Sequence, residues 1–111
     1  MTLAKKQCVP CQGGIPPLTR DEAEEYLEQV SEWTLSEDAK MIRRTFKFKN
    51  FVSALDFVNR VGDLAEQEGH HPDITFGWGY AAVTFYTHKL KGLHENDFIM
   101  AAKTDGLVAE T

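Results

Sequence analysis

Two adjacent histidines, His70 and His71, are the residues of this chain best suited to acid–base chemistry. An imidazole titrates near neutral pH, so it can both donate and accept a proton. Gly69 is expected to end a helix in a left-handed turn, and Pro72 prevents the helix from continuing. The sequence therefore predicts that the two rings lie on a short, stiff connector at a helix end.

A third histidine is predicted to lie near this pair. Residues 74–88 are expected to form a hairpin that turns near residues 77–80, and the outer ends of a hairpin lie side by side. His88, predicted to close the second strand, would then return toward His70 and His71. His94, beside the start of the last helix, is expected to be a surface residue.

Carboxylates are available to orient these rings. Glu66 lies one helical turn before His70, and Asp97 is expected in the first turn of the last helix. Residue types alone leave two equal alternatives, an acid–base site and a set of structural histidines at helix ends.

A metal site is the rival interpretation. Adjacent histidines in an extended segment point to opposite sides, and the spacing lacks the i, i+4 pair of a zinc hydrolase. Cys8 and Cys11 supply only two of the four ligands of a structural zinc, and no strand precedes them as in a redox motif. We expect metal-free chemistry and an exposed leader, with a zinc or redox module as the less favoured alternative.

Length and charge narrow the class of protein. With 111 residues and 42% hydrophobic residues, the chain is expected to form one globular domain. A net charge of -5 argues against nucleic acid and anionic membrane partners. No apolar run approaches the length of a membrane span, and the N-terminus lacks the apolar region of a signal peptide. A cytoplasmic location is therefore expected.

The elements that must position the histidines can be predicted from capping and periodicity. Residues 1–17 are expected to form a flexible leader, and Thr19 with Glu22 forms a capping box for the first helix. Asn50 is expected to cap the longest helix. Its core-facing residues are expected to be Phe51, Leu55, Phe57, Val58, Val61, Leu64 and Ala65. The predicted elements are helices from 19, over 51–67 and over 95–103, and strands over 33–35, 40–48 (with a bulge near Arg44), 74–78 and 81–88.

This order predicts an α+β fold, a four-stranded antiparallel sheet with three helices packed on one face. So small an open sheet leaves edge strands uncovered, and pairing with another subunit would protect them. We therefore expect a homo-oligomer, either a homodimer or a homotetramer.

A pattern of fixed gaps joins these residues: Glu66-x3-His70-His71-Pro72, then Trp78, His88 and Asp97. This pattern resembles the signature of the pterin-4a-carbinolamine dehydratases. The similarity extends from about Leu18 to Gly106, within a single domain over 18–111. Trp78 stands where that family commonly has tyrosine, and His94 stands where it commonly has the Thr or Ser that caps the last helix.

The resemblance implies dehydration of 4a-hydroxytetrahydropterin to quinonoid dihydropterin during pterin recycling, with no cofactor and no metal. It implies catalytic roles for His70, His71 and His88, and substrate-binding or orienting roles for Glu66, Pro72 and Asp97. Some members of the family also resemble dimerisation partners of a transcription factor. A non-enzymatic interaction module is therefore the alternative function.

Overall fold

The computed structural model describes residues 2–9 and 15–109 of the chain. Its helices are α1 (Arg20–Leu27), α2 (Phe51–Glu68) and α3 (Glu95–Ala109), and its strands are β1 (Thr34–Leu35), β2 (Ile42–Lys47), β3 (Asp73–Gly77) and β4 (Tyr80–Phe85). Three short 3-10 helices complete the fold: η1 (Leu3–Lys5), η2 (Glu28–Val30) and η3 (His88–Leu90). Within the described part of the chain, no helix combines the length and the apolar character that a membrane span requires.

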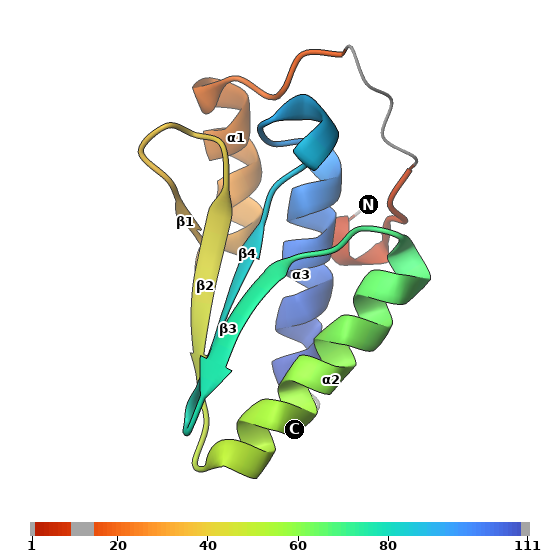
Figure 1. Cartoon of the computed structure of the whole chain (residues 1–111). Helices are drawn as coiled ribbons and strands as arrows, with labels where there is room; N and C mark the ends of the chain where they lie inside the picture. The colour runs from red at the N-terminus through yellow and green to blue at the C-terminus, as the bar shows by residue number, and fades with distance from the viewer. Residues whose placement is uncertain (1, 10–14, 110–111) are drawn as a thin grey trace.

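The four strands form one antiparallel sheet in the order β1-β2-β4-β3. The helices cover one face of this sheet (Figure 1), which confirms the predicted α+β fold. β2 pairs with β4 without interruption from Ile42↔Phe85 to Lys47↔Tyr80, so the predicted bulge near Arg44 is absent. Edge strands β1 and β3 each pair on one side only.

Helix α2 begins as the sequence predicts, because the Ser53 N–H donates to Oδ1 of Asn50 at 2.8 Å. Its buried face agrees with the predicted one except at Phe51 and Ala54 and at three half-buried positions. Phe51 is 43% exposed. It lies in the first turn of α2, beside the β3–β4 hairpin, and its ring contacts only the Phe76 ring among the described aromatic side chains. α2 buries Phe57, Val61 and Ala65 as predicted, together with Ala54, whereas Leu55, Val58 and Leu64 are half-buried.

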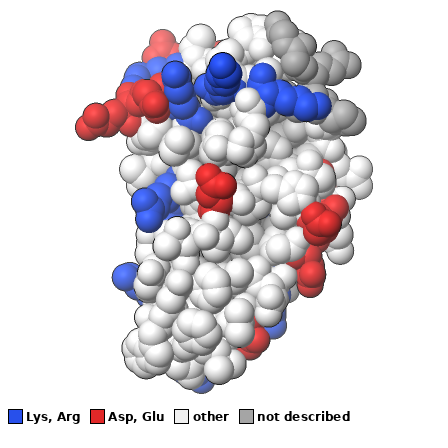
Figure 2. Space-filling view, in the orientation of Figure 1, with Lys and Arg blue, Asp and Glu red and all other residues white. Residues whose placement is uncertain are grey.

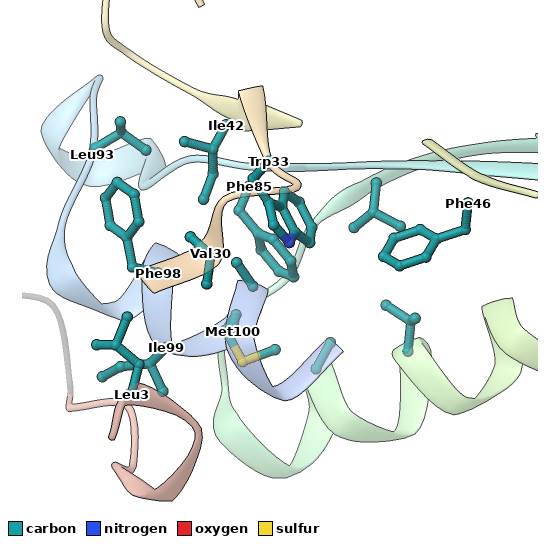
Figure 3. Packing of buried hydrophobic residues seen from close by; sticks show 14 of the residues in the cluster. Leu3, Val30, Trp33, Ile42, Phe46, Phe85, Leu93, Phe98, Ile99 and Met100 are labelled. Carbon is teal, nitrogen blue, oxygen red and sulfur yellow. The ribbon is translucent and has the colours of Figure 1, made fainter. Parts of the chain in front are cut away.

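Helix α3 packs its apolar side chains against the sheet (Figure 3). It continues through Gly106 to Ala109, whereas the sequence predicts an end near Lys103. The extra turns place Asp105 over the sheet. There its carboxylate accepts hydrogen bonds from Nε1 of Trp33 at 2.9 Å and from Nη1 of Arg44 at 2.7 Å.

Residues 2–9 of the predicted flexible leader are packed against the domain. Leu3 is buried in the core, and the Lys6 ammonium pairs with the Glu95 carboxylate at 2.5 Å. The Asn96 side chain accepts from the Val9 N–H at 3.1 Å and donates to the Val9 carbonyl at 2.7 Å. This part of the leader is therefore docked on α3, because its apolar and backbone polar groups find partners there.

Cys8 is held at the same place, with its backbone N–H donating to Oε1 of Glu68 at 2.9 Å. Burial raises the pKa of the Cys8 thiol to about 12, and the nearby Glu68 carboxylate adds to this effect. Cys11, the other half of the Cys-x-x-Cys motif, lies outside the described residues. Because the thiolate is the reactive form of cysteine, Cys8 is poorly suited to redox exchange near neutral pH.

The raised pKa predicts slow labelling of Cys8 in a Cys11→Ser variant, where it is the remaining thiol. At pH 8 roughly one such thiol in ten thousand is ionised, and greater thiolate nucleophilicity recovers only part of the loss. We expect reaction with a disulfide reagent at least about 30-fold slower than in the same variant unfolded in denaturant. The native rate should also keep rising above pH 9. Equal native and denatured rates would contradict the burial of this thiol.

Candidate functional site

The end of helix α2 sets the position of the two adjacent histidines. Gly69 adopts the predicted left-handed conformation, with φ 66° and ψ 28°. The N–H groups of Gly69 and His70 both donate to the carbonyl of Ala65. The chain therefore leaves the helix abruptly, and His70 and His71 lie on the connector between α2 and β3.

His70 is held by a buried carboxylate. Its Nε2 lies 2.6 Å from Oδ1 of Asp97, a side chain with no exposed surface. The other oxygen of Asp97 accepts from Oγ1 of Thr87 at 2.8 Å and from the His94 N–H at 3.0 Å. An ionised carboxylate can only accept, so this pairing puts a proton on Nε2 of a neutral His70 and leaves Nδ1 as its unprotonated nitrogen.

His94 is part of this arrangement and not the surface residue that the sequence suggests. Its Nδ1 accepts from the Asn96 N–H at 3.0 Å, while Asp97 accepts from the His94 N–H. This resembles a capping box, except that an imidazole replaces the usual hydroxyl and accepts from the second residue of the helix rather than the third. The spacing His94-x-x-Asp97 at a helix start is the signal that could have revealed it.

His71 has a different environment. Its Nε2 lies 2.5 Å from Oε2 of Glu66, but both side chains are mostly exposed. An exposed pair of this kind is screened by water and is easily broken. His71 is therefore accessible from solvent, in contrast to the enclosed His70.

His88 does not close a strand as predicted. β4 ends at Phe85, and His88 begins the 3-10 helix η3, because Thr87 instead pairs with Gly92 in an isolated bridge that folds the intervening residues into a tight turn. The His88 ring lies against the Tyr86 ring, with 4.2 Å between centroids. His88 is exposed and available to solvent.

The three predicted histidines line one shallow hollow of about 310 Å³. Asp97 and Glu66 support His70 and His71 from outside its lining, and Pro72 is not part of the lining either. The hollow is also lined by Thr87, Tyr86 and Lys89, which were not predicted as site residues. Of these, Thr87 could have been found from its place in the predicted strand, where it shares the inward face with Val83 and Phe85.

Two other observations bear on the nature of the site. A larger hollow of about 640 Å³ lies across β1 and β2, but none of its lining residues is a histidine and it contains no carboxylate–imidazole pair. Among residues 2–9 and 15–109, no three His, Cys, Asp or Glu side chains are arranged to share a metal ion. The smaller hollow is therefore the candidate acid–base site.

Comparison with known proteins agrees with this geometry. The model of the family described as Pterin 4 alpha carbinolamine dehydratase matches residues 16–107. Relatives from Methylococcus capsulatus and Halorhodospira halophila are each 62% identical to this chain over 109 residues, and both are provisionally named pterin-4-alpha-carbinolamine dehydratase. The match covers 98% of this chain in both cases, with 96% and 100% of the relatives.

Solved structures show the same fold. A Brucella melitensis protein described as a transcriptional coactivator/pterin dehydratase superposes with a TM-score of 0.77 at 33% identity, covering 82% of this chain and 97% of its own. A pterin dehydratase-like protein, identified as a RuBisCO assembly factor in the alpha-carboxysome, superposes with a TM-score of 0.60 at 27% identity. That match covers 68% of this chain and 88% of the other. Sequence and fold together place this chain in the pterin 4 alpha carbinolamine dehydratase family.

Proposed function

We propose that this chain dehydrates 4a-hydroxytetrahydropterin to quinonoid dihydropterin and water. The observation that carries the proposal is the single hollow lined by His70, His71 and His88. The family membership supports a pterin as the ligand. The proposed setting is pterin recycling after aromatic amino-acid hydroxylation, in the cytoplasm, without an organic cofactor or a metal.

The reaction needs two proton transfers. A proton is delivered to the oxygen on C4a, the C4a–O bond breaks to release water, and the proton on N5 is removed as the C4a=N5 double bond forms. We assign these transfers to His71 and His88, since both rings are exposed at the hollow and can change their protonation without breaking a buried contact.

The remaining residues are assigned to binding and orientation. Asp97 fixes the ring orientation and the protonated nitrogen of His70, so that Nδ1 of His70 can accept a hydrogen bond from the pterin. Glu66 orients His71 on the rim. Pro72 limits the backbone freedom of the connector that carries both rings.

An interaction module is the second candidate function. Phe51, Val52 and Trp78 are large apolar side chains that are 43%, 62% and 72% exposed. Exposed apolar side chains are a feature of protein-binding surfaces. Of the two proteins with solved structures, one is described as a transcriptional coactivator and the other as a RuBisCO assembly factor.

The exposed side chains and the uncovered edges of β1 and β3 support a homo-oligomer. We expect light scattering of the purified chain at micromolar concentration to give a mass twice or four times that of one chain. A monomer under these conditions would rule out the proposed homodimer and homotetramer.

Replacing either proton-transfer histidine should slow dehydration. We expect His71→Ala and His88→Ala each to lower the enzyme-dependent rate in a stopped-flow assay by about 100-fold or more, because a positioned acid or base contributes this much. His94→Asn is the matched control, since asparagine can cap α3 and the His94 ring does not line the hollow.

The outcomes separate the two candidate functions. Unchanged rates in both alanine variants would show that the roles of His71 and His88 are assigned wrongly. A wild-type chain that does not accelerate dehydration, but binds another protein in a fixed ratio, would favour the interaction module.

Asp97→Asn should damage the site while leaving the fold intact. The amide oxygen can still accept from Thr87 and His94, but its NH2 group then faces His70, whose Nε2 must become an acceptor. We expect a loss of about 100-fold in rate and a shift of the His70 proton to Nδ1, visible in the nitrogen NMR spectrum of the ring. The control is Asp105→Asn on the same helix, which should leave both the rate and the His70 spectrum unchanged.

A further inference from the structure

The hollow lined by His70, His71 and His88 adjoins a second hollow at His88. This second hollow also measures about 310 Å³, and it shares Tyr86 and His88 with the first. Its remaining lining residues are Asp38, Lys40, Met41 and Lys91. A ligand whose ring occupies the first hollow can therefore extend a substituent past His88 into the second.

The chemistry of a reduced pterin favours this placement. Proton transfer takes place at C4a and N5, and N5 is bonded to C6, the ring atom that carries the variable substituent. When C4a and N5 lie between His71 and His88, the C6 substituent begins one bond from the reacting nitrogen. The second hollow is then within reach of that substituent.

Positive charge gathers around these two hollows. Lys40 and Lys91 line the second and Lys89 lines the first, and all three are exposed. Figure 2 shows Lys and Arg side chains grouped across the end of the molecule where Figure 1 places η3 and the turn between β1 and β2, with Asp and Glu side chains beside them at one corner. This grouping occurs in a chain whose net charge is -5, so it is a local feature.

The lysines of the second hollow are available to a ligand. Within the described residues, neither Lys40 nor Lys91 has a carboxylate within 4.0 Å of its ammonium group. Asp38 is the one acidic residue lining this hollow. Its Oδ1 already accepts from Oγ of Ser36 and the Lys40 N–H, and these hydrogen bonds lower the pKa of Asp38, with a smaller contribution from the Lys40 charge. The second hollow is therefore lined by two lysines and one aspartate, and Asp38 balances only part of this positive charge.

Lys91 occupies an unfavourable backbone position at this rim. Its φ of 53° is left-handed, a conformation that glycine adopts more easily than lysine. The Lys91 N–H donates to the His88 carbonyl, which closes the η3 turn beside the catalytic ring.

We propose that the pterin bound by this site carries an anionic group on its C6 substituent, held in the second hollow by Lys40 and Lys91. The anionic group is a phosphate or a carboxylate, because both pair with ammonium groups. This inference rests on the proposed function, since it places the pterin ring in the catalytic hollow.

The test compares the dissociation constants of three reduced pterins for the full chain, measured by calorimetry at low ionic strength. The probes are 7,8-dihydroneopterin with a neutral side chain, its monophosphate, and 7,8-dihydrofolate with carboxylates. We expect at least one anionic probe to bind about tenfold more tightly than the neutral one, with the difference shrinking in high salt. The probe that gains most identifies phosphate or carboxylate as the preferred group.

Variants that remove lysine charges test where the anionic group binds. Lys40→Gln combined with Lys91→Gln should remove most of the preference for the anionic probe. The matched control is Lys47→Gln combined with Lys49→Gln, which removes the same charge from a hollow bordering α2 and should keep the preference. Lys91→Gly should weaken anionic binding without lowering the melting temperature, because glycine suits the left-handed position.

Three outcomes would overturn the inference: equal affinity for neutral and anionic probes, a preference that survives loss of Lys40 and Lys91, or an equal loss in the control. If the chain still dehydrates a neutral 4a-hydroxypterin in any of these cases, the proposed function stands and only the inference about the anionic group fails. If no reduced pterin binds and no dehydration occurs, the proposed function fails as well.

Discussion

The buried carboxylate of Asp97 is the contact on which the rest of the site depends. A buried carboxylate is costly unless hydrogen-bond donors surround it, and here the donors come from three separate segments. His70 follows α2, Thr87 follows β4, and the His94 N–H precedes α3. Satisfying one carboxylate therefore fixes a helix end, a strand end and a helix start relative to one another. The hollow beside His70 is a consequence of that convergence.

This arrangement separates one enclosed histidine from two exposed ones. His70 is enclosed, paired with Asp97 and packed nearly parallel to the Phe85 ring, so its position is set by the core. His71 and His88 lie at the exposed rim, where their contacts with Glu66 and Tyr86 leave them accessible. Proton transfer suits groups that can exchange with solvent between turnovers, and ligand orientation suits a group that cannot move. The one hollow contains both kinds.

Much of this fold could be predicted from local signals. Capping by Thr19 and Asn50, the left-handed Gly69 and the alternation of Val83, Phe85 and Thr87 are all determined by neighbouring residues. The errors arose where tertiary contacts decide the outcome. The length of α3 depends on the bonds of Asp105 to Trp33 and Arg44, and the exposure of Phe51 depends on where the sheet ends. The gathering of His70, His71 and His88 followed from the hairpin, but the Thr87–Gly92 bridge that turns His88 outward has no local signature.

The docked residues of the leader connect the two helix ends that form the site. Cys8 is hydrogen-bonded to Glu68, the last residue of α2, and Val9 is hydrogen-bonded to Asn96, one residue before Asp97. Two consecutive leader residues therefore join the helix end that precedes His70 to the helix start that carries its carboxylate partner. These hydrogen bonds of the leader hold the end of α2 and the start of α3 together. Residues far from the hollow in sequence therefore link the two helix ends between which the His70–Asp97 contact forms.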